Sequence, residues 1–198
     1  MRPAKRVSEA YLRRVAAWYL ERYEASSGRL QRVLRVRVQR SATAHGTDPA
    51  DAQPWIEAIL ADFAAMGAVD DARFAEGVLR RLAARGVARS RWRAELGQRG
   101  VPAATAARAI AQLQAEEAEE TEGGVDPARV AAARHARRRG FGPWARHAVD
   151  DVARRKQAMG LMRAGHAPDV VRAVLDPRNV DAARAWADGL LEDDACPG

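Results

Sequence analysis

The 198-residue sequence predicts an all-α protein of tandem three-helix repeats, helix-turn-helix-like units that form an elongated, curved body. Three observations predict this fold class. Apolar residues recur three and four positions apart along most of the chain, and no convincing alternation of period two is found. Helix-starting aspartate, serine and proline and helix-ending glycine separate these stretches. Similar segments also recur along the chain, as they do in repeat proteins.

The first three-helix unit is expected over residues 7–66. Its first helix, residues 7–23, has an apolar face formed by Tyr11, Val15, Trp18 and Tyr19. A second helix follows the break at Ser26-Ser27-Gly28 and carries Leu30, Leu34 and Val38. Residues 41–51 are expected to form a polar loop with a turn or cap at Thr47-Asp48-Pro49. The third helix is expected over residues 54–66.

The second unit, residues 70–115, has the clearest helix boundaries. Asp70 and Asp71 stand where an N-cap and a first-turn anion belong, and Gly86 ends the helix that they begin. Ser90 is expected to cap the next helix, and Val101-Pro102 begins the third. The apolar faces of the first two helices are formed by Phe74, Val78 and Leu82 and by Trp92 and Leu96.

The rest of the chain divides into three parts. Residues 116–125 are expected to be an acidic linker, either a solvated helix end or a negative patch that folds back on arginines or meets a basic partner. The third unit, residues 126–176, begins at an Asp126-Pro127 cap and first turn. Residues 177–198 are expected to form a short helix, 181–191, and an acidic tail.

The glycine-bounded segment of the second unit resembles the signature of the RecX family, which is close to G-Y-L-D-D-x-R-F-A followed by x-E-L-x-x-K-G-I. The matching runs are Gly67-Ala68-Val69-Asp70-Asp71-Ala72-Arg73-Phe74-Ala75, then Arg85-Gly86, then Glu95-Leu96-Gly97-Gln98-Arg99-Gly100-Val101. The chain departs from the pattern at Ala68, Val69 and Arg99. In the third unit it has His166 where the family often has an aromatic residue.

This resemblance implies a bacterial regulatory protein, itself built of tandem three-helix repeats. It implies binding to the RecA filament on single-stranded DNA, and lower recombinase, ATPase and coprotease activities of RecA. An arginine-lined body of several repeats is expected to touch several protomers and the enclosed strand, so that weak contacts add through effective concentration. Duplex DNA is expected to bind weakly, and the protein is expected to be a monomer.

The charge of the chain is concentrated in its first part. Residues 1–115 hold 20 basic and 11 acidic residues, a net charge of +9, and the only lysines of the chain are Lys5 and Lys156. Arginine suits forked contacts with phosphate or carboxylate, although a GC-rich coding sequence would also produce this preference. Attraction to a polyanion or an acidic protein surface is the functional interpretation, and a solvated helix surface is the alternative. The candidate RecA- or DNA-contacting residues are Arg32, Arg35, Arg73, Arg80, Arg81, Arg85, Arg89, Arg91, Arg93, Arg99, Arg138 and Arg155.

No motif predicts catalysis, so we expect no enzyme, no cofactor and no metal. The four histidines lack the spacing of metal ligands, and the Asp70-Asp71 and Asp150-Asp151 pairs are explained by helix capping or a polar helix face. No apolar run is long enough for a membrane span or a secretory signal, and the single cysteine, Cys196, favours a cytoplasmic location. The tryptophans at 18, 55, 92 and 144 are expected to pack in cores rather than stack on bases.

A helix-turn-helix transcription regulator that reads duplex DNA is the alternative from another class. Such a protein needs base-reading side chains at the start of one exposed helix. Ser90, Arg91 and Arg93 partly meet this requirement, but the other units lack an equivalent set. A preferred duplex sequence would favour this alternative, whereas a RecA regulator is indifferent to sequence.

Overall fold

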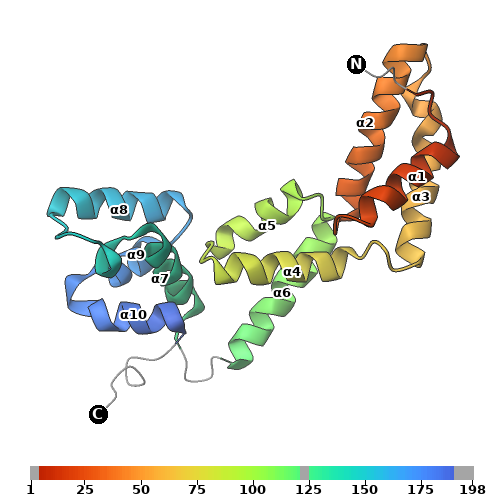
Figure 1. Ribbon diagram of the computed structural model, residues 1–198. Coiled ribbons are helices and arrows are strands. Elements are labelled where there is room, and N and C mark those ends of the chain that lie inside the picture. The colour runs from red at the N-terminus through yellow and green to blue at the C-terminus, as the bar shows by residue number, and fades with distance from the viewer. Residues whose placement is uncertain (1–4, 121–124, 190–198) are drawn as a thin grey trace. The chain divides into compact units, whose positions relative to one another are not determined.

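The computed structural model describes residues 5–120 and 125–189. Within these two ranges all regular secondary structure is helical, with ten α-helices and three short 3-10 helices (Figure 1). The predicted all-α fold class of tandem three-helix units is therefore confirmed. The helices follow one another in the predicted order, and most begin at a capping side chain or a proline.

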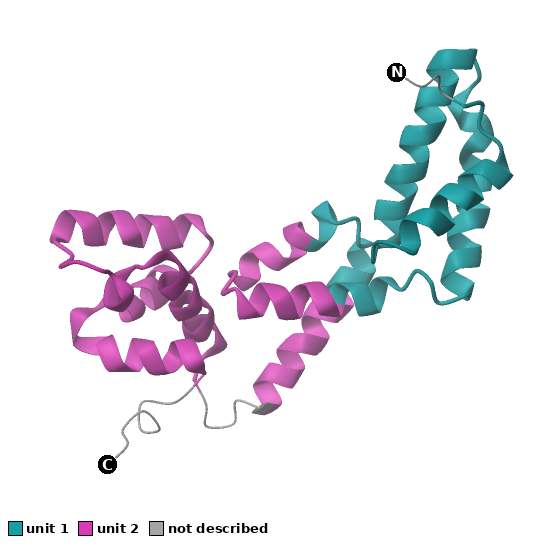
Figure 2. Cartoon of the chain, in the orientation of Figure 1, with its two compact units in different colours: residues 1–75, 96–107 teal, residues 76–95, 108–198 magenta. Residues whose placement is uncertain are grey.

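The chain divides into two compact units (Figure 2). Unit 1 comprises residues 1–75 and 96–107, and unit 2 comprises residues 76–95 and 108–198. Helices α4 (Asp71–Ala84), α5 (Arg89–Gln98) and α6 (Ala103–Glu120) each contribute residues to both units. The division into compact units thus runs through the second unit expected from the sequence, and the boundaries of the three sequence units stay predictions.

Unit 1 contains a bundle of α1 (Glu9–Leu20), α2 (Ser27–His45) and α3 (Gln53–Ala65), which lie side by side in Figure 1. Ser8 and Ser26 cap α1 and α2 by accepting hydrogen bonds from backbone N–H groups three residues on. Asp48 caps the 3-10 helix Pro49–Ala52 that leads into α3, as its place before proline predicts. The buried core is formed by Leu12, Ala16, Leu30, Leu34, Val38, Ala52, Ile56, Ile59 and Val69.

The prediction of a polar loop over residues 41–51 is wrong for residues 41–45, which belong to α2. Helix α2 continues through His45 and ends at Gly46, whose φ of 65° is the left-handed conformation that glycine adopts at low cost. Ser41 and Ala42 are buried, and the Ser41 hydroxyl oxygen accepts a hydrogen bond from the Val7 backbone N–H at 3.0 Å. The helix therefore gains burial and a tertiary hydrogen bond from small residues that the apolar pattern does not count.

The start of α2 is held by the segment that follows α5. The Ser26 hydroxyl donates to the carbonyl oxygen of Arg99 at 2.6 Å, and an Arg32 guanidinium nitrogen donates to that of Gln98 at 2.9 Å. A Cβ atom on Gly28 would lie 2.4 Å from the carbonyl oxygen of Gly100, so only glycine permits this approach. The glycine-bounded signature thus supports the first bundle as well as its own helices.

Helices α4 to α6 begin close to their predicted starts, with one correction. Asp70 accepts hydrogen bonds from the N–H groups of Ala72 and Arg73, both at 3.0 Å, which confirms its capping role. Helix α5 begins at Arg89, so the prediction that Ser90 is its cap is wrong. Helix α6 includes residues 116–120 of the acidic run, and residues 121–124 lie outside the described residues.

Unit 2 contains a second cluster built on α7 (Pro127–Arg139), α8 (Asp151–Arg163), α9 (Pro168–Leu175) and α10 (Val180–Asp188). Asp126 caps α7, as predicted. Helices α7 and α10 lie side by side in Figure 1, and both present alanines to the shared core, which lets their backbones approach closely. The predicted helix over residues 181–191 is therefore part of the core, with Trp186 only 4% exposed. Its residues 190 and 191 lie outside the described residues.

The departures from the family signature have different consequences. Val69, at the position where leucine is common, is buried in the core of unit 1. Ala68 is exposed, so an aromatic residue at this position would lie at the surface of the described structure. Valine in place of leucine at position 69 keeps an apolar side chain in the core. Alanine in place of an aromatic residue at position 68 does not affect that core, because the position is exposed.

Candidate functional site

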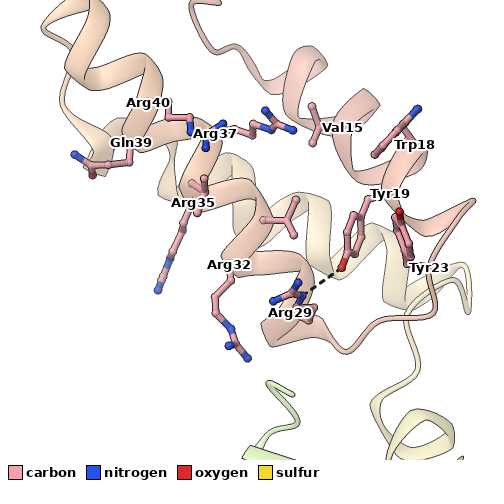
Figure 3. Close-up of a pocket in the computed structure, with 12 residues that line it drawn as sticks. Val15, Trp18, Tyr19, Tyr23, Arg29, Arg32, Arg35, Arg37, Gln39 and Arg40 are labelled. Atoms are coloured by element: carbon pink, nitrogen blue, oxygen red, sulfur yellow. Dashed lines mark hydrogen bonds between the residues drawn. The ribbon is translucent and has the colours of Figure 1, made fainter. Parts of the chain in front are cut away.

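A groove of about 720 Å³ lies between α1 and α2 of unit 1, and we call it the α1–α2 groove (Figure 3). One side is formed by α1 and the residues after it, which contribute three aromatic side chains: Trp18, Tyr19 and Tyr23. The other side is formed by α2, which contributes five arginines: Arg29, Arg32, Arg35, Arg37 and Arg40. Two of these five, Arg32 and Arg35, are among the twelve candidate residues predicted from the sequence.

Helical periodicity places these arginines together. Leu30, Leu34 and Val38 recur every four residues and are buried in the bundle core. The arginines lie between and on either side of these positions. In Figure 3 Arg29 and Arg37 extend toward α1, whereas Arg32 and Arg35 extend away from it. Helix α2 is thus apolar toward the core and cationic beside the groove.

Among the residues that the structure describes, the α1–α2 groove is lined by basic side chains and by no acidic one. The Arg29 Nε donates a hydrogen bond to the Tyr19 hydroxyl at 3.2 Å, and an Arg35 guanidinium nitrogen donates to the Gln53 amide oxygen at 3.3 Å. Arg37 and Arg40 form no hydrogen bond or ion pair with the residues described. The groove is therefore a cationic surface of the kind that attracts anionic molecules.

The prediction that Trp18 packs in a core is wrong. Its side chain is 51% exposed, because Leu12 and Ala16 form the buried stripe of α1 and Trp18 lies to one side of that stripe. The Arg22 guanidinium lies 4.4 Å from the centre of the Trp18 ring. Trp92, by contrast, is 1% exposed as predicted, and Trp55 and Trp144 are partly buried against the two cores. The exposed ring is the feature of the groove that the sequence analysis missed.

The predicted arginines of α4 and its surroundings remain mostly exposed. This group comprises Arg73, Arg80, Arg81, Arg85 and Arg93. Arg80 lies 3.9 Å from the Glu76 carboxylate, which confirms the pair expected from their spacing. Arg99 is half-buried, and its carbonyl oxygen accepts from Ser26. These side chains do not line the α1–α2 groove.

The start of α5 is used for internal contacts within unit 2. The Ser90 hydroxyl donates to the carbonyl oxygen of Gly165 at 2.9 Å, and the Arg91 guanidinium donates to that of Arg163. Arg89 pairs with Glu117, so part of the acidic run does fold back on an arginine. Two of the three side chains that a duplex-reading helix would need are therefore already engaged.

Of the two candidate arginines in the third sequence unit, Arg155 lies among carboxylates. Arg138 is exposed on the last turn of α7, and Arg155 is exposed on α8. Arg155 lines a second groove, of about 630 Å³, that also contains Asp151 and Asp176. The hydrogen bond from the Arg178 guanidinium to Asp176, at 2.9 Å, lowers the pKa of that carboxyl to about 2. This mixed surface is a weaker candidate for an anionic partner than the α1–α2 groove is.

A pair of histidines, which the sequence spacing did not predict, lies inside unit 2. The Nδ1 atom of His135 on α7 lies 3.1 Å from the Nε2 atom of His166, which precedes α9. Burial, together with the electrostatic effect of His135, lowers the pKa of His166 to about 4. Burial also lowers the pKa of His135, as do the nearby charges of Arg138 and Arg139. Both imidazoles are therefore neutral at neutral pH.

The acidic pairs serve helix structure. Asp70 caps α4, Asp150 caps α8 by accepting from the Ala153 N–H at 2.7 Å, and Asp151 pairs with Arg154 at 3.1 Å. Residues 5–120 and 125–189 contain no group of three or more histidine, cysteine, aspartate or glutamate side chains placed to hold a metal ion. No helix in these ranges is both long and apolar enough to span a membrane.

Comparisons with known proteins agree with the signature in α4 and α5. Residues 70–110 match the family model described as RecX, second three-helix domain. The chain is 34% identical over 176 residues to regulatory protein RecX of Myxococcus xanthus strain DK1622, and this match covers 88% of the chain and 89% of that relative. The match extends over nearly all of both chains, well beyond the signature itself. The chain belongs to the RecX family.

Proposed function

We propose that this protein regulates RecA by binding the filament that RecA forms on single-stranded DNA. Binding lowers the recombinase, ATPase and coprotease activities of RecA. Membership of the RecX family supports regulation of RecA in general. That this regulation is inhibition exerted on the filament is our proposal.

The observation that carries the proposal is the α1–α2 groove, with five arginines and no acidic side chain among its described lining residues. A nucleoprotein filament presents phosphates and protein carboxylates, and guanidinium groups form paired hydrogen bonds with both. The exposed arginines of α4, including Arg80 and Arg81, would add a second cationic contact. Contacts that are individually weak add through effective concentration when they belong to one chain.

Strand exchange promoted by RecA between single-stranded and homologous duplex DNA tests this function. The parent protein is expected to lower the rate of exchange in proportion to its concentration, independently of the DNA sequence. A negative control is Trp92→Ala, which removes a buried side chain and is expected to unfold its surroundings. Unchanged exchange at a protein concentration equal to that of RecA would contradict the proposal.

The alternative function, that of a transcription regulator that reads duplex DNA, has less support. Ser90 and Arg91, which would have to face the bases, bond instead to the backbone before α9. Selection from a pool of random duplexes separates the two functions, because a transcription regulator enriches one sequence and a filament regulator enriches none.

A further inference from the structure

We propose that the α1–α2 groove is a binding site for single-stranded nucleic acid, in which bases stack on Trp18 and Tyr23 and phosphates bind the arginines of α2. The proposal deepens the proposed function, because the filament on which the chain would act contains a single strand of DNA. It assigns the contact with that strand to one groove of unit 1 and to named side chains.

The aromatic side of the groove carries the first part of the argument. Trp18 is 51% exposed and Tyr23 is 53% exposed, although both belong to residue types that usually bury most of their surface. Neither belongs to the buried core of the bundle, so folding of unit 1 does not explain their type. Tyr23 also lies beside Tyr19, with ring centres 5.1 Å apart and planes tilted by 40°. Exposed rings at the edge of a cationic groove are what bases stack on in sequence-tolerant binding of single strands.

The cationic side of the groove matches a phosphate backbone in length. Arg29 and Arg40 are eleven residues apart on one helix, a separation of about 17 Å at the rise of an α-helix. A stacked strand would place about five nucleotides over this distance, and an unstacked strand places fewer because it is more extended. Within that distance Arg37 and Arg40 form no hydrogen bond or ion pair with a described residue, so their donors are available to phosphates. Arginines along one helix, with aromatic rings beside them on α1 and after it, suit a polyanion that carries its bases on one side.

The composition of the groove favours a single strand over the other anionic partners. Bases in a duplex have their faces covered by stacking, so a duplex would use the arginines and leave Trp18 and Tyr23 without a role. An acidic peptide would likewise pair with the arginines, but its carboxylates offer no ring face to Trp18 and Tyr23. In an unstacked strand every nucleotide carries both groups, so its phosphates can bind α2 while its bases stack on the aromatic edge.

Direct binding of DNA by the full chain, without RecA, tests the proposal. The probe is a fluorescein-labelled oligothymidylate of about 15 nucleotides, within the range bound by single-strand modules, and anisotropy reports binding. Trp18→Ala is expected to weaken binding roughly 5- to 150-fold, the range found when one stacked base loses its platform. The double variant Arg37→Gln/Arg40→Gln is expected to reduce the log–log salt slope by about 1.4, since each phosphate contact contributes about 0.7.

The matched control removes the same amount of positive charge from a surface outside the α1–α2 groove. Arg108→Gln/Arg172→Gln also removes two exposed arginines, and neither residue lines the α1–α2 groove. Its affinity and salt slope are expected to remain close to those of the parent. Circular dichroism is expected to be unchanged in all variants, because the substituted side chains are exposed. If the control weakens binding as much as the groove variants do, binding is diffuse and the proposal is wrong.

Two further outcomes separate this proposal from the proposed function. If the parent inhibits RecA but does not bind the oligonucleotide, the assigned site is wrong and regulation of RecA stands. If the groove variants bind the oligonucleotide like the parent but inhibit RecA poorly, the groove docks on protein rather than on the strand, which also overturns the assignment. Loss of oligonucleotide binding in Trp18→Ala with the fold intact, whatever its effect on RecA, supports it.

Discussion

Asp71 accepts two hydrogen bonds from Ser27, one from the backbone N–H at 2.8 Å and one from the side-chain hydroxyl at 2.5 Å. Ser27 is the first residue of α2, where backbone N–H groups have no partner within the helix. The second aspartate of the signature thus stabilises the start of the arginine-bearing helix, in addition to its place in the first turn of α4. The two adjacent aspartates have different roles, since Asp70 caps α4 itself.

This relationship predicts coupling between the two residues. Asp71→Ala is expected to lower the free energy of unfolding by about 1.5–3 kcal/mol, the usual range for hydrogen bonds to a charged group. Ser27→Ala removes only the hydroxyl and is expected to cost less. Urea unfolding of both single variants and the double variant gives a coupling energy, expected to be about 1 kcal/mol. Strictly additive effects of the two substitutions would show that this contact does not stabilise the protein.

The close packing around Gly86 leads to a second prediction, which concerns the stability of a variant with a larger residue there. It has a φ of 65°, and a Cβ atom there would lie 2.4 Å from the carbonyl oxygen of Ala131 and 2.6 Å from the backbone nitrogen of His135. Gly86→Ala is therefore expected to cost more than the roughly 1 kcal/mol of an unfavourable backbone conformation alone.

The control for Gly86 is Gly97, which lies inside α5 with nothing within 4 Å of its Cβ position. Gly97→Ala is expected to stabilise the helix by up to about 1 kcal/mol, because alanine loses less backbone entropy than glycine. Thermal unfolding of both variants measures the difference. A destabilisation of about 1 kcal/mol or less in Gly86→Ala would mean that α7 does not approach Gly86 closely.

The histidine pair predicts loss of stability in mild acid. The pKa of His166 is lowered to about 4 in the folded protein, below the ordinary value of 6.5, so the unfolded chain binds a proton first as the pH falls. The free energy of unfolding is therefore expected to be independent of this group above pH 6.5 and to decrease between pH 6.5 and 4. Between about pH 7 and about pH 5 the loss is expected to be on the order of 2 kcal/mol.

Urea unfolding at several pH values measures this loss. His166→Phe is expected to remove most of the dependence on pH, whereas His147→Gln, at an exposed histidine, is expected to leave it unchanged. The Asp176 carboxyl titrates in a lower range, because its pKa is about 2, and its contribution is lost only below its ordinary value of 3.8. A parent protein equally stable at pH 7 and pH 5 would contradict the burial of the pair.

The exposed arginines of α4 give a prediction that separates stability from regulation. Arg80→Glu/Arg81→Glu is expected to change the free energy of unfolding by less than about 0.5 kcal/mol per site, because both side chains are exposed. It reverses local charge and is expected to weaken the inhibition of RecA. Inhibition equal to that of the parent would make this face a solvated surface and leave the α1–α2 groove as the remaining candidate.

The sequence predicted helices better than it predicted which sides of them are buried. Caps and glycines are local signals, so the starts of α4 and α7 and the end at Gly86 could be found from a few residues. Burial depends on which helices pack together, which the sequence does not state. Trp18 and Phe74 stand at helical spacing with apolar residues, yet Trp18 is exposed and Phe74 is only partly buried.

The candidate site was only partly predicted, again because the sequence does not state which side chains become buried when helices pack. Arginine spacing along α2 was visible in the sequence, and Arg32 and Arg35 do line the groove. The aromatic side was missed because an apolar ring at helical spacing is more often core than surface. The engagement of Ser90 and Arg91 was also missed, because their partners are about seventy residues away in the chain.

The rate of ATP hydrolysis by RecA on single-stranded DNA, titrated with this protein, tests the central claim most directly. At fixed RecA and DNA concentrations the rate is expected to fall as the parent protein is added. It is expected to fall far less with Trp92→Ala, in which loss of a buried side chain should disrupt the fold. The fall is expected to be the same on DNA of unrelated sequences. A rate that stays constant up to equimolar parent protein would contradict the account.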